Sequence, residues 1–387
     1  MSFSGSFDHE FGPHRPDGGV GPGRDHLHIP DGILPAILWI VIGVVLQTGL
    51  ALRFTAFLVD FTYGWLMAAL VITIGCASSP ARQPAVQTAP ESRPARASVV
   101  VPSLEILGMD TMLNVVGRLG SEAVFFQVTP ASIGRNLRGG WVVEHDPFQI
   151  NQFLHPYQGA MYHNIARSAG FGYWQSAAFT LAGSAMWEIA GETTPPSWND
   201  QIASGVAGSF LGEPLFRTAR MLMNRRRGAP GPWSFLTSAA VSPPVGFNRL
   251  LFGDRYDPPT PEILDAADIR FDVGVEAPLL PHASAQWSRP FIGILVDYGV
   301  PGTLGYTHAR PFDYFRIDGT VSSDGLDNLS TRGLIAGKDY QGGDTVRGIW
   351  GVYGTYDYFA PDVFRISSTA LAFGTTAESW MNQQTQH

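Results

Sequence analysis

The chain has 387 residues, which is long enough for two or three domains. Its formal net charge is −8 and no Lys/Arg-rich face stands out, and this argues against a nucleic-acid partner. Only 15% of the residues are charged, whereas glycine (44 residues) and aromatic residues (12%) are plentiful, a composition typical of envelope or membrane-associated proteins. The single cysteine excludes an internal disulfide framework and any multi-cysteine metal site.

The N-terminal third contains two long apolar stretches. Residues 1–28 are rich in Gly, Pro and His, a pattern typical of a disordered segment. Residues 33–52 and 54–74 are each apolar enough and long enough to cross a bilayer as a helix. A tether rich in Pro, Ala and Ser follows over residues 77–100. Residues 1–76 are therefore predicted to be a disordered start followed by apolar signal or membrane segments.

The second apolar stretch ends at Gly75-Cys76, directly before the tether. This order resembles a bacterial lipoprotein signal, which implies that lipid is attached to Cys76 after cleavage. Two residues depart from that pattern: Thr73 stands where an aliphatic residue is usual, and Arg53 is the only nearby positive charge. The alternative is a transmembrane hairpin in which Cys76 is simply a small buried residue.

A second resemblance lies at His28-Ile29-Pro30-Asp31-Gly32, which precedes the first apolar stretch. The segment resembles the start of the membrane subunit of cobalt/nickel energy-coupling transporters, in which an N-terminal histidine segment binds the metal. This resemblance implies metal transport that depends on His28. However, the segment lies behind 27 further residues, whereas that site is built around a free N-terminus. Translation from a mis-set start codon would explain the segment equally well, and we assign no metal ligand.

Residues 101–255 are predicted to form a helical domain. Helices are expected over residues 157–168 and 173–190, and a third helix is expected to begin after Ser197, its N-cap. Asp200 stands three residues after this cap, as in an acidic variant of the capping box. Upstream, residues 104–119 form either a helix or a pair of strands, and residues 141–144 indicate a strand.

Strongly polar side chains interrupt these apolar helical runs: His155, His163, Asn164, Arg167, Glu188, Glu192, Asp200, Glu213 and Arg217. Burying such groups costs several kcal/mol each unless they find partners, so we expect them to pair with one another or to stay hydrated. Glu213 and Arg217 have i, i+4 spacing and are expected to pair, most simply on the helix surface. Ser204, Gly208 and Gly212 recur at the same spacing and predict a smooth face that a neighbouring helix can approach closely.

Clustered titratable groups in an apolar setting are also what catalytic sites require. The candidate catalytic residues are His155, Glu188, Asp200 and Glu213. An imidazole would act as general base, and a carboxyl group as acid or metal ligand. The candidate binding residues are His163, Asn164, Arg167 and Arg217. No nucleophile elbow, phosphate loop or HExxH spacing occurs, so neither a reaction nor a cofactor is identified, and whether the chain is an enzyme stays open.

The same helices carry a family resemblance in an ordered set of residues: Asn151, His155-Pro156-Tyr157-Gln158-Gly159, Tyr162, Asn164, Ala166-Arg167-Ser168, Gly183-Ser184, Trp187-Glu188, Glu192, Pro196-Ser197, Asn199-Asp200, Gly212-Glu213 and Arg217. Over residues 145–255 this order resembles the domain-of-unknown-function 3943 family of Gram-negative envelope proteins. The chain departs from it at His163, a place that is often aromatic, and at Gln201, which is often aliphatic. The resemblance implies a bacterial protein at the outer membrane or facing the periplasm, and it supplies no activity.

From Ile269 the pattern becomes that of β-strands, with apolar and charged residues alternating strictly over residues 269–277. Further amphipathic runs follow, separated by Gly, Asp and Asn turns: 291–300, 314–322, 332–340, 345–359 and 363–380. Such runs are typical of outer-membrane barrel strands. Five aromatic residues would suit a girdle at the membrane interface: Trp350, Tyr353, Tyr356, Tyr358 and Phe359. The alternative is an ordinary antiparallel sheet in a soluble sandwich.

These strands are too few to close the smallest bacterial barrel, which needs about eight. Either the sequence is a truncated reading of a longer protein, as we favour, or residues 100–145 supply further strands, or the sheet stays open. The predicted fold class is α+β, with N-terminal apolar helices, a central helical domain and, over residues 265–380, an antiparallel sheet that resembles a partial outer-membrane barrel. We expect a protein of the bacterial outer membrane with a structural or binding role and the lipid bilayer as its partner. The alternative is an envelope enzyme acting on lipid or glycan.

Overall fold

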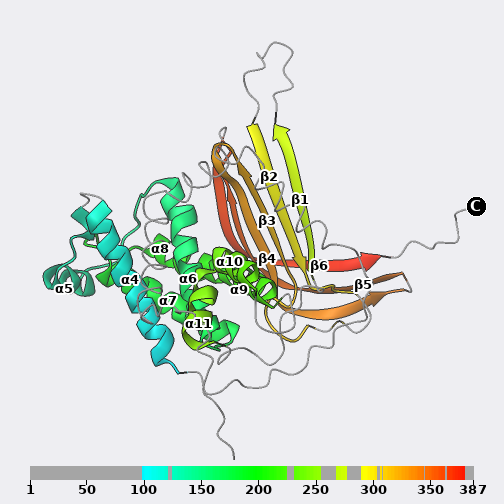
Figure 1. The fold of residues 1–387 in the computed structure, drawn as a ribbon, viewed down its shortest axis with the longest axis horizontal. Helices are drawn as coiled ribbons and strands as arrows, with labels where there is room; N and C mark the ends of the chain where they lie inside the picture. The colour runs from blue at the N-terminus through cyan, green and yellow to red at the C-terminus, as the bar shows by residue number, and fades with distance from the viewer. Residues whose placement is uncertain are drawn as a thin grey trace, which may run out of the picture.

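The computed structural model describes residues 98–120, 124–224, 231–253, 267–276, 289–302, 306, 308–343, 345–361 and 364–379. The predictions for residues 1–76, including those for His28 and Cys76, lie outside the described residues. Within these ranges a group of helices lies beside one antiparallel sheet, with the helices first in the chain (Figure 1). A mixed helical and antiparallel fold is therefore confirmed, whereas the division into domains stays a prediction.

The helices account for most of residues 100–252. In chain order they are α4 (Val100–Gly120), the short η1 (Val124–Phe126), α5 (Pro130–Arg138), the π-helix η2 (Ile150–Leu154), α6 (His155–Ser168), α7 (Tyr173–Ala190), α8 (Trp198–Ile202), the π-helix η3 (Ala203–Ala207), α9 (Gly208–Met223), α10 (Pro232–Val241) and α11 (Pro243–Phe252). The predicted helices over 157–168 and 173–190 are confirmed. Because residues 104–119 lie within α4, the strand alternative for them is wrong, and the described residues between 100 and 145 supply no strand to the sheet.

Residues 141–144 do not form a strand of the sheet, contrary to the prediction. Val142 instead makes an isolated parallel bridge with Ser197, the N-cap residue of α8. The Val142 N–H donates to the Pro196 carbonyl at 2.8 Å, and the Trp198 N–H donates to the Val142 carbonyl at 2.9 Å. The extended residues thus pair with the turn at the start of α8, and this turn is too short to continue a β-ladder.

The helix α6 and the η3–α9 segment approach each other closely because glycines meet where they cross. A Cβ atom on Gly159 would lie 1.8 Å from the Ser204 carbonyl oxygen. A Cβ atom on Gly208 would lie 2.6 Å from the Gly159 Cα, and one on Gly212 would lie 2.8 Å from the His163 Cβ. The prediction that Ser204, Gly208 and Gly212 present a smooth face to a neighbouring helix is confirmed.

The sheet has six strands in sequence order, each antiparallel to the next. They are β1 (Ala267–Glu276), β2 (Arg289–Tyr298), β3 (Phe315–Ser322), β4 (Gly325–Gly342), β5 (Val346–Phe359) and β6 (Ile366–Ser379). All six predicted strand runs are present with shifted ends. Within the described residues β1 and β6 pair with one neighbour each, so the sheet is open; it is strongly twisted (Figure 1).

The middle of one sheet face packs against the helices. Val296, Ile317, Thr331 and Tyr356 stand opposite one another in successive strands and therefore share this face. Val296, Ile317 and Tyr356 belong to the same buried apolar cluster as residues of α4, α6, α7 and α9. The Tyr356 hydroxyl also donates to the Gln152 carbonyl of η2 at 2.6 Å. Helices and sheet thus share one hydrophobic core.

Three of the aromatic residues assigned to an interfacial girdle are buried instead. Tyr356 and Tyr358 lie in the shared core, and Tyr353, on the opposite face, lies in a second buried cluster. The girdle prediction is wrong for these three because helices cover one face and the chain before β3 covers part of the other. Trp350 and Phe359 are 43% and 38% exposed.

Candidate functional site

The polar side chains of the helical unit gather in two buried groups with different partners. The Glu213 network consists of His163, Arg167, Glu213, Arg217, Arg310 and Asp313. The His155 cluster consists of Glu144, Asp146, His155, Glu188, Glu192, Asp200 and Ser204. The four candidate catalytic residues are thus divided, since Glu213 lies in the first group and His155, Glu188 and Asp200 lie in the second.

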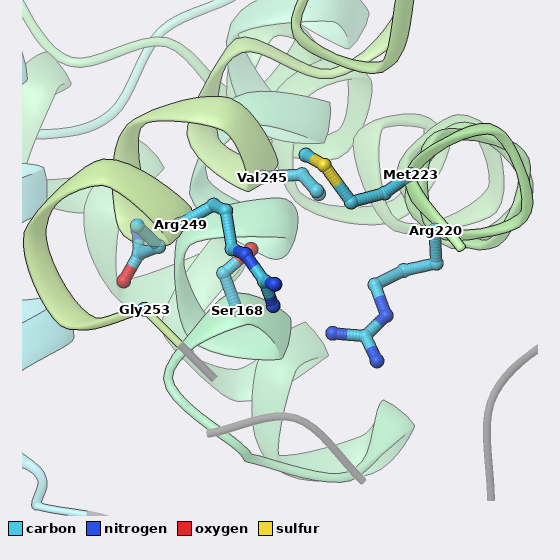
Figure 2. A pocket seen from close by; sticks show the side chains of 7 residues that line it. Ser168, Arg220, Met223, Val245, Arg249 and Gly253 are labelled. Carbon is cyan, nitrogen blue, oxygen red and sulfur yellow. The ribbon is translucent and has the colours of Figure 1, made fainter. Parts of the chain in front are cut away.

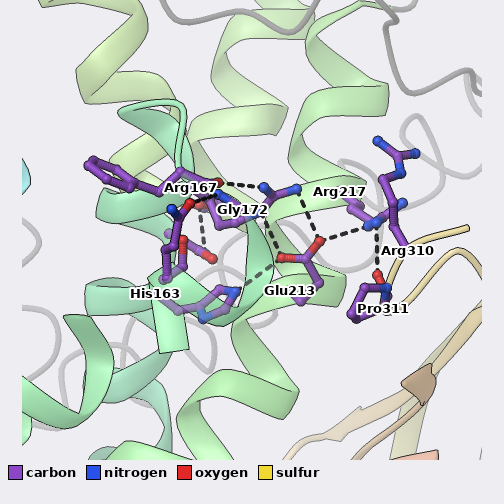
Figure 3. A network of polar contacts seen from close by, with 12 residues as sticks. His163, Arg167, Gly172, Glu213, Arg217, Arg310 and Pro311 are labelled. Carbon is purple, nitrogen blue, oxygen red and sulfur yellow. Dashed lines mark hydrogen bonds and ion pairs between the residues drawn. The ribbon is translucent and has the colours of Figure 1, made fainter. Parts of the chain in front are cut away.

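The carboxylate of Glu213 binds three side chains (Figure 3). The Nε atoms of Arg167 and Arg217 each lie 2.8 Å from one of its oxygens, and the His163 Nε2 lies 3.0 Å from Oε2. Glu213 and Arg217 are four residues apart on α9, as are His163 and Arg167 on α6, so two helix faces meet at one carboxylate. The predicted Glu213–Arg217 pair is confirmed, but its surface location is wrong. Both side chains are buried, at 0% and 1% exposed, because α6 and the chain before β3 cover them.

The Glu213 carboxyl is ionised and the His163 imidazole is neutral. Burial alone would raise the pKa of Glu213, but Arg167, the hydrogen bond from His163 and Arg217 together hold that pKa well below its usual range. Burial lowers the pKa of His163. The neutral imidazole therefore donates its Nε2–H to the carboxylate, which two guanidinium groups share.

Arg217 extends this network to the chain before β3. Its Nη1 donates to Asp313 Oδ1 at 3.2 Å and its Nη2 donates to the Pro311 carbonyl at 2.9 Å. Asp313 also accepts the backbone N–H groups of Ala309 and Arg310, at 3.1 and 2.7 Å. Sequence analysis missed Asp313 and Arg310, since Asp313 follows Arg217 by 96 residues and no local pattern marks either of them.

The turn that carries Asp313 is fixed by an unusual backbone conformation. Phe312 has a φ of 62°, in the left-handed region that bulky residues rarely adopt. Its ring is fully buried against Tyr173 and Phe210. A Cβ atom on Gly333 would lie 1.9 Å from that ring, so only glycine fits opposite it. Packing thus holds a conformation that costs about 1–3 kcal/mol by itself, as is common near functional sites.

A small and a larger cavity adjoin α6 and α9. The small one, drawn in Figure 2, has a volume of about 20 Å³, enough for one water molecule. Its lining residues are Ser168, Arg220, Met223, Val245, Asn248, Arg249 and Gly253. The larger one, which we call the arginine cavity, has a volume of about 200 Å³. It is lined by Arg167, Gly172, Tyr173, Trp174, Gln175, Glu213, Arg217, Arg310 and Pro311.

The four candidate binding residues differ in what they reach. Arg167 and Arg217 line the arginine cavity, whereas His163 and Asn164 are fully buried. The Asn164 amide nitrogen donates to the Gly212 carbonyl at 2.7 Å, and its oxygen accepts from the Ser242 hydroxyl at 2.9 Å. Asn164 therefore ties α6 to α9 and to the start of α11, which is a structural role.

The His155 cluster contains a serine, a histidine and an aspartate in line. Ser204 Oγ lies 3.3 Å from His155 Nδ1, and His155 Nε2 lies 3.8 Å from Asp200 Oδ1. The three residues come from η3, the first turn of α6 and α8, and all three are buried. Hydrolases use the same three groups, but with the serine at Nε2 and the aspartate hydrogen-bonded to Nδ1 of the histidine. Here Ser204 lies at Nδ1, and 3.8 Å to Asp200 is too long for a hydrogen bond. Ser204 was predicted only as part of the smooth helix face.

Four carboxyl groups of the same cluster, those of Glu188, Glu144, Glu192 and Asp146, have raised pKa values. Burial raises the pKa of Glu188 to about 9 and that of Glu144 to about 7, and nearby carboxylates contribute in the same direction. Burial also raises the pKa values of Glu192 and Asp146. Glu188 accepts the Ser197 N–H at 2.8 Å, and Glu192 accepts the Trp187 indole N–H at 2.7 Å. At neutral pH the Glu188 carboxyl therefore keeps its proton.

Fold and site together define a helical unit with two buried polar groups, packed against an open antiparallel sheet. Residues 140–244 match the family model described as Domain of unknown function (DUF3943), so the predicted resemblance to that family is confirmed over the central helices. This span contains both buried groups except for Arg310 and Asp313. No curated protein and no solved structure matches the chain. The resemblance to cobalt/nickel transporters stays a prediction, since its residues lie outside the described ranges.

Proposed function

We propose that this chain is a membrane-associated protein of the bacterial cell envelope, with a structural or binding role. The observation that carries this proposal is an exposed group of apolar residues on two strands, which we call the β5–β6 patch. It consists of Trp350, Val352, Leu371 and Phe373, which are 43%, 37%, 67% and 74% exposed. Val352 stands opposite Phe373, and the rings of Trp350 and Phe373 are in contact, with centroids 5.5 Å apart. Contiguous apolar surface of this kind marks an interaction site.

The β5–β6 patch continues the sheet face whose middle is covered by helices. Trp350 and Val352 lie on the same face of β5 as Tyr356, because side chains alternate along a strand. Besides the buried cluster of Leu334, Ile349 and Tyr353, the opposite face carries charged residues on successive strands: Asp268, Arg270, Asp297, Arg316, Asp318, Arg332 and Asp357. An apolar face backed by a charged face is the pattern of an outer-membrane strand, with lipid on one side and a polar interior on the other. We propose that this sheet is part of such a wall.

The helix α4 adds apolar surface of a similar kind. Among the described helices it is the one long and apolar enough to cross a bilayer, and 33% of its most apolar stretch is buried in the protein. One side packs in the core through Ile106, Met109 and Leu113. Leu104, Leu107, Val115 and Leu119 are 62%, 49%, 46% and 84% exposed. A helix that is apolar on both sides suits contact with a core on one side and with lipid on the other.

Charges in the β5–β6 patch should abolish binding to lipid. We expect the full chain to float with phospholipid vesicles, and the double variant Leu371→Asp with Phe373→Asp to remain in the aqueous fraction. An arginine or lysine on a lipid-facing strand costs roughly 2–4 kcal/mol near the bilayer centre and an aspartate costs less. Two aspartates together should therefore lower the partition at least about tenfold. The measurement is the floated fraction in a density gradient.

Ala372→Asp is the matched control for this experiment. Ala372 lies between the two substituted residues and is also exposed, but its side chain is on the opposite, polar face of β6. The control variant should float like the unmodified chain. Equal flotation of the double variant and the control would overturn the proposal.

A second candidate function is an envelope hydrolase acting on lipid or glycan, and the proximity of Ser204, His155 and Asp200 favours it. Ser204→Ala removes the attacking oxygen and keeps a residue that suits a helix. If this function holds, hydrolysis of envelope lipid esters should fall by about 10³-fold or more while the unfolding midpoint stays within a few degrees. Unchanged hydrolysis, or none in either protein, would leave these residues a structural role.

A further inference from the structure

The arginine cavity brings three guanidinium groups to one space beside a helix N-terminus. Arg167, Arg217 and Arg310 line it, and among the described lining residues Glu213 is the one carboxylate. We infer that this cavity binds a phosphate group, either as free phosphate or as the phosphate of a lipid headgroup. This inference concerns a different surface from the β5–β6 patch and does not depend on the proposed contact with lipid.

The first turn of α7 lines the cavity. This helix runs for 18 residues from Tyr173, and its N-cap residue is Gly172, which makes no side-chain cap hydrogen bond. Tyr173, Trp174 and Gln175, the first three helical residues, all line the cavity. The N–H groups of a first turn have no acceptor within their own helix, and the helix dipole adds partial positive charge there. A phosphate suits such a position because its oxygens accept several of these N–H groups at once.

The guanidinium groups are held in place before any ligand binds. The side chain of Arg167 is 10% exposed; its Nη1 donates to the Phe171 carbonyl at 2.6 Å and its Nη2 donates to Glu213 Oε1 at 3.2 Å. Arg217 is held by Glu213 and Asp313. Asp313 also pairs with Arg310, whose side chain is 27% exposed. A guanidinium carries five N–H donors in a planar fork, so one edge can hold a carboxylate and another a phosphate. Such preorganisation lowers the cost of binding.

The size and opening of the cavity indicate how the phosphate would be presented. A volume of about 200 Å³ exceeds what one phosphate group fills, so part of an attached organic group fits as well. Trp174 lines the cavity and is 63% exposed, which places this indole where the cavity meets solvent. An exposed tryptophan at such an opening suits contact with the glycerol region of a lipid or with another organic substituent.

Gly172→Asp tests this inference because it should change folding and binding in opposite directions. Gly172 has φ −74° and ψ 170°, which suits an N-cap aspartate, and the nearest contact of a new Cβ would be 3.6 Å. The aspartate would accept the first-turn N–H groups and place a negative charge in the cavity. We expect the unfolding midpoint to rise and the affinity for inorganic phosphate, measured by titration calorimetry on the full chain, to fall at least about tenfold.

Gly172→Ala is the matched control, since it adds a Cβ but no acceptor and no charge. Its phosphate affinity should stay within about threefold of the unmodified chain, whereas Arg310→Gln should lower it about tenfold. Vesicles of phosphatidylcholine with and without phosphatidic acid distinguish the sources, because a headgroup site predicts tighter binding when phosphatidic acid is present. Binding of soluble phosphate alone indicates free phosphate as the ligand.

Absence of binding in both arms would overturn the inference, as would equal affinity of the Gly172→Asp variant and the unmodified chain. The double variant in the β5–β6 patch should still bind soluble phosphate, so failure of the proposed membrane contact can be told from failure of the phosphate site.

Discussion

Replacing Glu213 by glutamine is expected to lower the free energy of unfolding by about 3–5 kcal/mol. Glutamine has the same shape but no charge, so Arg167 and Arg217 would lose the carboxylate that they share. Arg217 would keep its pair with Asp313, but the side chain of Arg167 is 10% exposed and would lose its carboxylate, and a buried charge without a counter-charge is strongly destabilising. Chemical denaturation with circular dichroism at pH 7 measures the difference.

Glu276→Gln is the control for this variant, because Glu276 is 59% exposed and lies 3.6 Å from Arg289. A pair with one exposed partner contributes up to about 1 kcal/mol.

The stability that ionised Glu213 contributes should depend on pH, because its pKa in the folded protein is held below its usual range. This stabilisation is fully present above the pKa of the unfolded chain and is lost as pH falls through the pKa of the folded protein. The unmodified chain should therefore lose this contribution in acid, and the variant should not. Equal stability of Glu213→Gln and the unmodified chain at pH 7 would contradict the prediction.

Glu188→Gln is expected to stabilise the protein at alkaline pH and to leave it unchanged near pH 5. Burial raises the pKa of Glu188 from its ordinary value of 4.5 to about 9. Between these values the folded protein keeps a proton that the unfolded chain releases, so stability falls as pH rises, by at most about 1.4 kcal/mol for each pH unit. Glutamine does not ionise, and its side-chain oxygen can still accept the Ser197 N–H.

Unfolding free energies from pH 5 to pH 9 test this second prediction. The advantage of Glu188→Gln should grow steadily with pH, while Glu276→Gln should follow the unmodified chain throughout. The pKa values of Glu144 and Glu192 in the same cluster are also raised, so part of the pH dependence should remain in the variant. Parallel pH curves for Glu188→Gln and the unmodified chain would show that Glu188 ionises in the folded state as it does in the unfolded one.

Local pattern was sufficient to predict the elements whose periodicity is strong. Helical spacing identified α6 and α7, and strict alternation identified β1. The α4 segment stayed ambiguous because apolar residues occupy both of its sides, so neither period dominates. Residues 141–144 have the composition of a strand, but they pair with the N-cap of a helix. The pattern of a segment alone does not show which other segment it will pair with.

The sequence identified individual residues of the candidate sites, but not which of these residues lie together. Polar groups in apolar helices were expected to pair with one another or to stay hydrated, and His163, Arg167, Glu213 and Arg217 take the first of these outcomes. It did not reveal that Glu213 is separate from His155, because that depends on how helices cross. Asp313 joins from a distant strand connection, and its role follows from the tertiary fold alone.

The π-helical turn η3 sets how α9 is rotated about its own axis, and therefore the direction in which each α9 side chain points. A π-turn holds one more residue than an α-turn, and each residue advances the direction of a helix by about 100°. Removing one residue from η3 would therefore swing the Glu213 side chain away from His163 and Arg167 while every member of the network remained in the sequence. The length of a five-residue segment, rather than the identity of its residues, decides whether that carboxylate meets its cations.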